Sequence, residues 1–240
     1  SLEDIDAVGH RVVHGGARFY QAIQIDNTVL EAIKDLSPLA PLHNPANATG
    51  IEVAQQLFTE AAQVAVFDTA FYHDLPAKAR NYAINSDFAT EHEIRVYGFH
   101  GISHEYVNAQ TQQFLSNDKA RVINLHLGNG CSATAISAGK PIDHSMGFGP
   151  LTGLVMGTRS GDIDPSVILY LIEQKGMSAA AVKELLTKNS GMLGLSGHSD
   201  LREIEALALS GNAAAQQALE LNTYRIQKYI GAYTAALGGL

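Results

Sequence analysis

The sequence predicts an α/β fold, because a β-rich run, a helical pattern and a second β-rich run follow one another at its start. Residues 5–13 are rich in β-forming side chains and stop at a glycine pair, Gly15-Gly16. Residues 45–58 carry apolar side chains at helical spacing behind a proline suited to a first turn. Residues 64–67 form a short apolar run typical of a buried strand.

The middle of the chain predicts a β-hairpin. Residues 121–127 and 132–137 are two further strand-like runs. The residues Gly128-Asn129-Gly130 join them, and an Asn-Gly pair favours a tight turn. The two strands are therefore expected to pair with each other.

After this hairpin the signals become helical. Asp164 is suited to cap a helix that has Pro165 at its first position, and Gly176 is suited to stop it. Three more segments have a starter residue followed by apolar residues with a period of 3.6. They are residues 178–188, 199–209 and 212–237.

Composition excludes several classes of protein. Hydrophobic residues make up 46% and charged residues 17%, which is typical of a globular chain. The formal net charge is −8, so no overall positive field draws nucleic acid or an anionic membrane surface. No apolar run approaches the roughly 20 residues of a membrane-spanning helix. A single cysteine, Cys131, cannot form an intramolecular disulfide, and a reducing cytoplasm is expected.

The ends of the sequence and one internal segment bear on domain organisation. The chain opens at Ser1 without a methionine and closes on an apolar run, residues 235–240, which indicates a fragment. The polar stretch 72–85, with Pro76 inside it, is the best hinge candidate. The predicted domains are therefore residues 1–75 and residues 76–240.

Two charged side chains lie where predicted strands end, and open α/β sheets bind ligands outside such ends. Arg11 stands among apolar strand residues just before the glycine pair, where its planar fork could grip a carboxylate or a phosphate. A surface arginine on an edge strand explains the pattern equally well. Asp68 follows the run 64–67 and could orient a nucleophile or accept a proton. An aspartate that caps the next turn is the simpler alternative.

Two glycine-containing segments could hold phosphate. The turn that follows His126 and Leu127 could direct backbone N–H groups at an anion, although a plain Asn-Gly hairpin is a strong rival. Residues 143–165 hold five glycines between 147 and 161, and Arg159 among them could reach a phosphoryl group. A flexible structural loop is the alternative there.

The ten histidines do not predict a metal site, because none shows the paired spacing of zinc ligands. No metal-ligating residue is therefore assigned. Cys131 has no activating base nearby in sequence, so we interpret it as a small packing residue.

In combination, these segments resemble the acetate kinase family, in order and along nearly the whole chain. Seven segments carry the resemblance: residues 9–16, 38–45 with Pro-Leu-His-Asn-Pro at 41–45, 67–71, 97–101, 124–130, 145–165 and 200–202. The resemblance implies two ribonuclease-H-like α/β domains of the sugar kinase, Hsc70 and actin superfamily, each only partly present. Residues 1–75 would be the remainder of the amino-terminal domain, and residues 76–240 the first part of the nucleotide-binding domain.

The resemblance also implies an activity and its residues. The activity is reversible transfer of the γ-phosphoryl group of ATP to acetate, giving acetyl phosphate and ADP, with Mg²⁺, in a cytoplasmic homodimer that binds no nucleic acid and no membrane. The implied catalytic residues are Asp68, His100 and Arg159. The implied substrate residues are Arg11, which holds the carboxylate, and the walls of a pocket for the acetate methyl group, Val13, Leu42, Phe99 and Pro150. The implied nucleotide residues are His126, Leu127, Gly128, Asn129, Gly130, Asp200, Leu201 and Arg202.

Departures from the family pattern leave alternatives open. Tyr72 replaces a usual histidine, Thr152 a usual glutamate, and Ile102, His144 and Gly149 replace usual threonines. The family's serine-rich phosphate loop and glycine-rich adenosine loop do not occur in these 240 residues. A kinase for propionate or another short-chain carboxylate is one alternative. A catalytically inactive fragment is the other.

Overall fold

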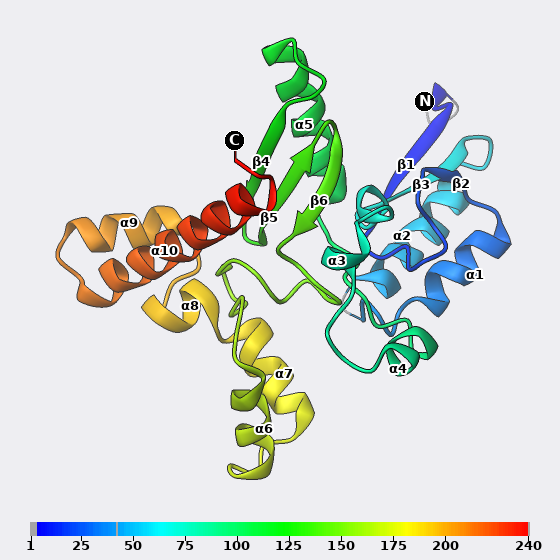
Figure 1. The fold of residues 1–240 in the computed structure, drawn as a ribbon. Helices are drawn as coiled ribbons and strands as arrows, with labels where there is room; N and C mark the ends of the chain where they lie inside the picture. Colours follow the sequence, from blue (N-terminus) through cyan, green and yellow to red (C-terminus); the bar gives the residue numbers. More distant parts are fainter. Residues whose placement is uncertain (1–3, 42, 240) are drawn as a thin grey trace. The chain divides into compact units, whose positions relative to one another are not determined.

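The computed structural model describes residues 4–41 and 43–239 and divides into two compact units (Figure 1). The first unit is Ser1–Ala120 with Gly139–Pro141, and the second is Arg121–Ala138 with Ile142–Leu240. One three-stranded sheet lies in the first unit and most of a second three-stranded sheet in the second, each with helices, so the predicted α/β class is confirmed. The predicted boundary between residues 75 and 76 concerns the domains of the family fold and stays a prediction.

The sheet of the first unit is mixed. Its strands are β1 (Ala7–Val12), β2 (Ile23–Gln24) and β3 (Ala62–Phe67), in the order β1-β3-β2. Strands β1 and β3 are parallel, in a register that runs from Ala7 opposite Ala62 to Val12 opposite Phe67. These two strands confirm the runs predicted from the sequence. Strand β2 pairs antiparallel with β3 and was not predicted, because two residues are too short to show a pattern.

Two helices cover this sheet and complete its core. Helix α2 (Asn44–Leu57) packs on β1 and β3, and its first turn contains proline as predicted. Helix α1 (Asn27–Asp35) packs on α2, and the Asp26 side chain caps it by accepting from the Val29 amide at 2.8 Å. The remaining helices of this unit are η2 (Ala70–Tyr72), α3 (Ala77–Arg80), α4 (Ser86–Glu91) and α5 (Gly101–Leu115).

The second unit begins with the predicted hairpin. Strands β4 (Arg121–Leu127) and β5 (Cys131–Ser137) are antiparallel, and β6 (Lys140–His144) follows β5 in the sheet. Because Leu127 lies opposite Cys131, the turn has three residues rather than two. The predicted hairpin is thus present, and neither Asn129 nor Gly130 has the positive φ of a type I′ turn.

Five helices follow among the described residues. They are α6 (Pro165–Glu173), α7 (Ala179–Lys188), α8 (Gly191–Ser196), α9 (Leu201–Leu209) and α10 (Ala213–Ala236). All but α8, which was not predicted, start close to the predicted positions. The predicted caps of α6, α7 and α10 each accept a backbone N–H from the first turn. The helix expected from Ser199 begins at Leu201, because Asp200 is the residue that caps it.

Helix α10 is the long support of the second unit. It packs on α8 and α9 and on strands β4 and β5 (Figure 1). The buried side chains of this core are Val155, Met192, Ile204, Ala215 and Ala218. Within residues 4–41 and 43–239, none of the helices combines the length and apolar character needed to cross a bilayer.

A buried asparagine links the end of β1 to the helices. The Asn44 Oδ1 accepts from the His14 amide at 3.1 Å, and Nδ2 donates to the His14 carbonyl at 3.0 Å and to the Ile33 carbonyl at 3.3 Å. Asn44 is fully buried, so water cannot replace these bonds.

Replacing Asn44 by leucine should therefore lower the free energy of unfolding by about 2–4 kcal/mol, because three buried backbone groups would lose their partner. The matched control is Asn27→Leu, at an exposed position in the first turn of α1, which should change stability by less than about 0.5 kcal/mol. Urea unfolding of both variants measures the difference. Equal stability of the two variants would contradict the assigned role of Asn44.

Candidate functional site

An arginine and a carboxylate meet at the carboxyl ends of the parallel strands. Arg11 is the next-to-last residue of β1, and Asp68 directly follows β3. The Arg11 guanidinium donates to both oxygens of Asp68, with 3.1 Å between Nε and Oδ1. The Asp68 side chain is 2% exposed whereas that of Arg11 is 58% exposed. A buried carboxylate therefore faces an arginine that still reaches solvent and can contact a second anion.

His100 is connected to this pair through the next residue in the chain. It precedes α5 with a left-handed backbone, at φ 58°, and it is half-buried. The next residue, Gly101, donates its amide to the Asp68 carbonyl at 2.9 Å. A Cβ at Gly101 would come within 2.2 Å of that carbonyl oxygen, so only glycine permits this approach. Three predicted site residues, Arg11, Asp68 and His100, are thus held together by β1, β3 and the start of α5.

The predicted walls of an acetate methyl pocket are only partly described. Val13 and Phe99 are buried in the first unit, at 4% and 1% exposure. Pro150 is half-buried in the second unit, where its carbonyl accepts from the Arg159 guanidinium. Leu42 lies outside the described residues. The pocket itself therefore stays a prediction.

His14 follows Val13 in the chain, packs against the Phe99 ring and is completely buried. Its Nδ1 accepts from the Gly16 amide at 3.0 Å, and its ring meets Phe99 edge-on at 5.5 Å and Tyr97 at 4.5 Å between centroids. With Nδ1 as an acceptor, the proton of the neutral ring lies on Nε2, which has no acceptor among the described residues. Burial and then the positive charge of Arg95 lower the pKa of His14 to about 4.

In the second unit, a cavity of about 330 Å³ brings together two segments that were predicted separately. The hairpin supplies Leu127, Gly128 and Asn129, and the start of α9 supplies Asp200 and Leu201. The rest of the lining is Cys131, Val155, Met156, Gly157, Met192, Ser199 and Asn222. The predicted residues His126, Gly130 and Arg202 do not line this cavity.

The hairpin turn is suited to hold an anion. Its three carbonyls are used within the unit, since Gly128 O accepts from the Cys131 thiol, Asn129 O from the Gly157 amide and Gly130 O from the Gly128 amide. The amides of Asn129 and Gly130 have no acceptor among the described residues. Their two N–H groups are therefore available to a phosphate oxygen.

Gly157 fixes the position of this turn. Besides its bond to Asn129, at 2.9 Å, its carbonyl accepts from the Leu193 amide at 2.9 Å in α8. A Cβ on Gly157 would lie 2.0 Å from the Asn129 Oδ1. The glycine-rich segment therefore works as a close spacer between the hairpin turn and α8, and this part of it has fixed contacts rather than those of a flexible structural loop.

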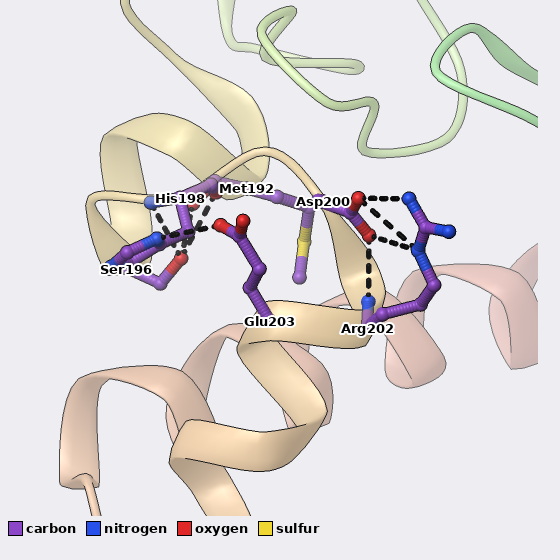
Figure 2. Close-up of polar contacts among 6 residues, drawn as sticks. All are labelled: Met192, Ser196, His198, Asp200, Arg202 and Glu203. Atoms are coloured by element: carbon purple, nitrogen blue, oxygen red, sulfur yellow. Dashed lines mark hydrogen bonds and ion pairs between the residues drawn. The ribbon is translucent and has the colours of Figure 1, made fainter.

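Asp200 and Arg202 form an ion pair at the start of α9 (Figure 2). The Asp200 Oδ1 accepts from the Arg202 amide at 2.9 Å and from its Nε at 3.0 Å, and Oδ2 lies 2.5 Å from Nη2. These bonds lower the pKa of Asp200 to about 2. Figure 2 also shows the neighbouring turn, where His198 Nδ1 lies 3.0 Å from Glu203 Oε2 and the Ser196 hydroxyl donates to the Met192 carbonyl.

Arg159 and Cys131 are neighbours in the second unit. Arg159 is half-buried, its Nη1 donates to the Pro150 carbonyl at 2.5 Å, and burial lowers the pKa of its guanidinium. Burial raises the pKa of the Cys131 thiol to about 11, although the Arg159 charge opposes this shift. The thiol stays protonated near neutral pH, which agrees with its interpretation as a packing residue.

Some site residues had no usable signal in the sequence. Asn222 lines the cavity from the middle of a long helix, where an asparagine looks like any surface polar residue. Val155 and Met156 line it from a loop, and their apolar side chains predict only core packing. Gly157 could have been found, since it belongs to the glycine-rich run.

Among residues 4–41 and 43–239, His, Cys, Asp and Glu side chains do not gather in threes in a way that could hold a metal ion.

The burial of His14 predicts a pH dependence of stability. Its pKa is about 4 in the folded chain against an ordinary 6.5, so the unfolded chain binds the proton more tightly. The contribution of neutral, buried His14 to the free energy of unfolding is complete above about pH 6.5 and is lost as the pH falls through 4. It should amount to about 3 kcal/mol. His14→Gln should flatten the unfolding free energy between pH 6.5 and pH 4.

The matched control for this measurement is His92→Gln, because His92 is an exposed histidine of the same unit. Since His14→Gln also loses the bond to Gly16, the slopes of unfolding free energy against pH are compared rather than the absolute values. Parallel slopes for the two variants would contradict the assignment.

Comparison with known proteins places the chain in a family. The Acetokinase family model matches residues 1–240. The acetate kinase of Flavobacterium johnsoniae is 55% identical over 240 residues, and that of Thermotoga maritima is 50% identical over 243. The match spans all of this chain but only 61% and 60% of those proteins.

Solved structures agree with this result. A propionate kinase from Francisella tularensis subsp. tularensis superposes with a TM-score of 0.95 at 49% identity, over 98% of this chain and 61% of that one. The acetate kinase of Porphyromonas gingivalis gives a TM-score of 0.94 at 49% identity, over 100% and 61%. The fold is therefore that of these kinases, as the resemblance implied, and the chain belongs to the acetokinase family.

Proposed function

We propose that the protein containing this chain transfers the γ-phosphoryl group of ATP to acetate, reversibly, to give acetyl phosphate and ADP. The observation that carries the proposal is the cavity of about 330 Å³, in which the hairpin turn and the start of α9 face one ligand-sized space. Two unused backbone N–H groups at the turn suit a nucleotide phosphate, as do the close glycine contacts.

The strand ends of the first unit supply the acceptor side of the proposed reaction. Arg11 holds the acetate carboxylate with the part of its guanidinium that Asp68 does not occupy. Asp68 keeps Arg11 in position and acts as the catalytic carboxylate. His100 and Arg159 neutralise charge on the transferring phosphoryl group, which is the main requirement of this chemistry.

The residues of this chain would hold the nucleotide directly, whereas the metal ion would be held mainly by the nucleotide. The cavity residues fit ATP or ADP, with Asn129 at a phosphate and Asp200 and Leu201 at the nucleoside end. Mg²⁺ supplies charge neutralisation on the phosphate oxygens when it is bound, and in this proposal it comes with the nucleotide rather than in a cage built by these residues. A homodimer in the cytoplasm remains part of the proposal.

The direct test is an assay of acetyl phosphate formation from ATP with acetate, propionate or butyrate as the acceptor. Preference for acetate supports the proposal. Preference for propionate supports the second candidate, which the likeness to the Francisella propionate kinase favours. No transfer to any of the three acceptors by the intact protein would contradict both.

Val13 is expected to help limit the acceptor to acetate. It follows Arg11 by two residues and is buried beside His14, so shortening it would open space near the carboxylate. One buried methylene is worth roughly 0.8 kcal/mol, and pockets of this kind discriminate by about 1–3 kcal/mol. Val13→Ala should therefore raise the propionate-to-acetate ratio of kcat/KM several-fold.

Measuring both specificity constants alongside a melting curve separates the pocket role from a packing role. If Val13 only fills the core, the substitution leaves a cavity, lowers the melting temperature and leaves the ratio unchanged. That outcome would rule out Val13 as a wall of the acceptor pocket.

The spacing at Gly157 predicts a second measurable effect. Gly157→Ala would force the Asn129 side chain to move, since the new Cβ would lie 2.0 Å from Oδ1. ADP affinity should fall several-fold, because Asn129 lines the proposed nucleotide cavity. Gly149→Ala is the matched control from the same glycine-rich segment, because a Cβ there meets nothing within 4 Å. Calorimetric titration with ADP measures both, and equal affinities would contradict the role of Gly157.

A further inference from the structure

A second cavity lies in the first unit, and none of the proposed active-site residues lines it. Its volume is about 340 Å³, within the range of about 300–1,000 Å³ for small-molecule sites. Helices α3 and α4 and the segment that follows α4 form it. The lining is Ala17, Arg80, Asn81, Tyr82, Ser86, Ala89, Thr90, Glu93, Ile94 and Arg95.

Two arginines face this cavity, and neither has a carboxylate partner among the described residues. The Arg80 Nε reaches only the side chain of Asn81, at 3.5 Å. The Arg95 Nε is buried and has no acceptor among the described residues. Arginine side chains that are half-buried usually pair with an anion, because their desolvation is costly otherwise.

The surroundings of Arg95 increase the free-energy cost of burying its charged side chain. Its guanidinium lies over the Tyr97 ring, with 5.1 Å from Cζ to the centroid, which fixes the side chain in place. Burial and then the neighbouring Arg80 charge lower the pKa of Arg95. Two like charges thus lie close together in partly buried positions. A bound anion would remove the repulsion.

One acidic residue partly balances the charge. Glu93 also lines the cavity and acts on Arg95 through its negative charge, but it makes no ion pair with Arg80 or Arg95. The charged lining is therefore two arginines against one glutamate. A dianion would complement this balance better than a neutral ligand.

We propose that this cavity binds the phosphate group of a small molecule, and that Arg80 and Arg95 are the two residues that bind it. Guanidinium groups match phosphate oxygens with paired hydrogen bonds. Polar groups of Asn81, Ser86 and Thr90 line the same space. The volume leaves room for an organic portion beside the phosphate, so a phosphate monoester fits the cavity more fully than free phosphate does.

The test uses the purified protein, inorganic phosphate, and glycerol phosphate as a simple monoester. Binding is followed through the arginine Nε–H resonances in ¹⁵N-resolved NMR, because Arg95 lines this cavity and not the proposed nucleotide cavity. A titrating shift of that resonance is expected with either probe. Tighter binding of glycerol phosphate assigns the site to phosphate esters, and tighter binding of inorganic phosphate assigns it to the free ion.

Four variants make the test specific. Arg95→Gln and Arg80→Gln should each weaken phosphate binding about tenfold or more, as loss of a charged hydrogen-bond donor typically does. Glu93→Gln should tighten it a few-fold, because a competing negative charge is removed. Lys119→Gln, an exposed cation of the same unit that does not line the cavity, should leave binding unchanged.

Arg80→Gln keeps the test valid if Arg95→Gln fails to fold. The backbone carbonyl of Arg80, which accepts from the Val96 amide at 2.8 Å, is unaffected by that substitution. An Arg95 Nε–H resonance that does not move at saturating phosphate overturns the proposal. Equal affinities for wild type, Arg80→Gln and Lys119→Gln overturn it as well.

Discussion

The first unit depends on the ion pair between Arg11 and Asp68. A carboxylate that is 2% exposed is stable only with partners, and here the fold supplies a guanidinium from the neighbouring strand. The parallel register of β1 and β3, with Val12 opposite Phe67, brings the two side chains to the same end of the sheet. His100 then follows, because Gly101 packs directly on the Asp68 backbone.

In the second unit, close backbone contact rather than charge positions the candidate site. Gly157 lies between the hairpin turn and α8 and bonds to both, so the turn, α8 and the start of α9 face one cavity. The carbonyls of Gly128, Asn129 and Gly130 are all engaged, whereas the amides of Asn129 and Gly130 have no acceptor among the described residues. The proposed phosphoryl transfer depends on positioning the phosphate and needs no nucleophile in the second unit. The protonated thiol of Cys131 agrees with this.

Local signals in the sequence were sufficient for elements whose ends are defined by one side chain. Asp164, Ser178 and Asn212 cap helices as predicted, because a capping oxygen acts within three residues. Non-local features were missed. Strand β2 exists only because β3 pairs with it. The burial of the His14 Nε2–H group likewise depends on residues far away in sequence. The candidate site was predictable mainly as a conjunction of motifs, while their arrangement in a shared cavity required the structure.

The central claim is that the strand-end carboxylate Asp68 directs phosphoryl transfer to acetate. Its most direct test is kcat for acetyl phosphate formation by Asp68→Asn in the intact protein, with ADP affinity and melting temperature measured in parallel. The account predicts a loss of about 10²–10⁴-fold in kcat, with ADP affinity retained, because the proposed nucleotide cavity lies in the other unit. A kcat close to that of the wild type in a stable variant would contradict it.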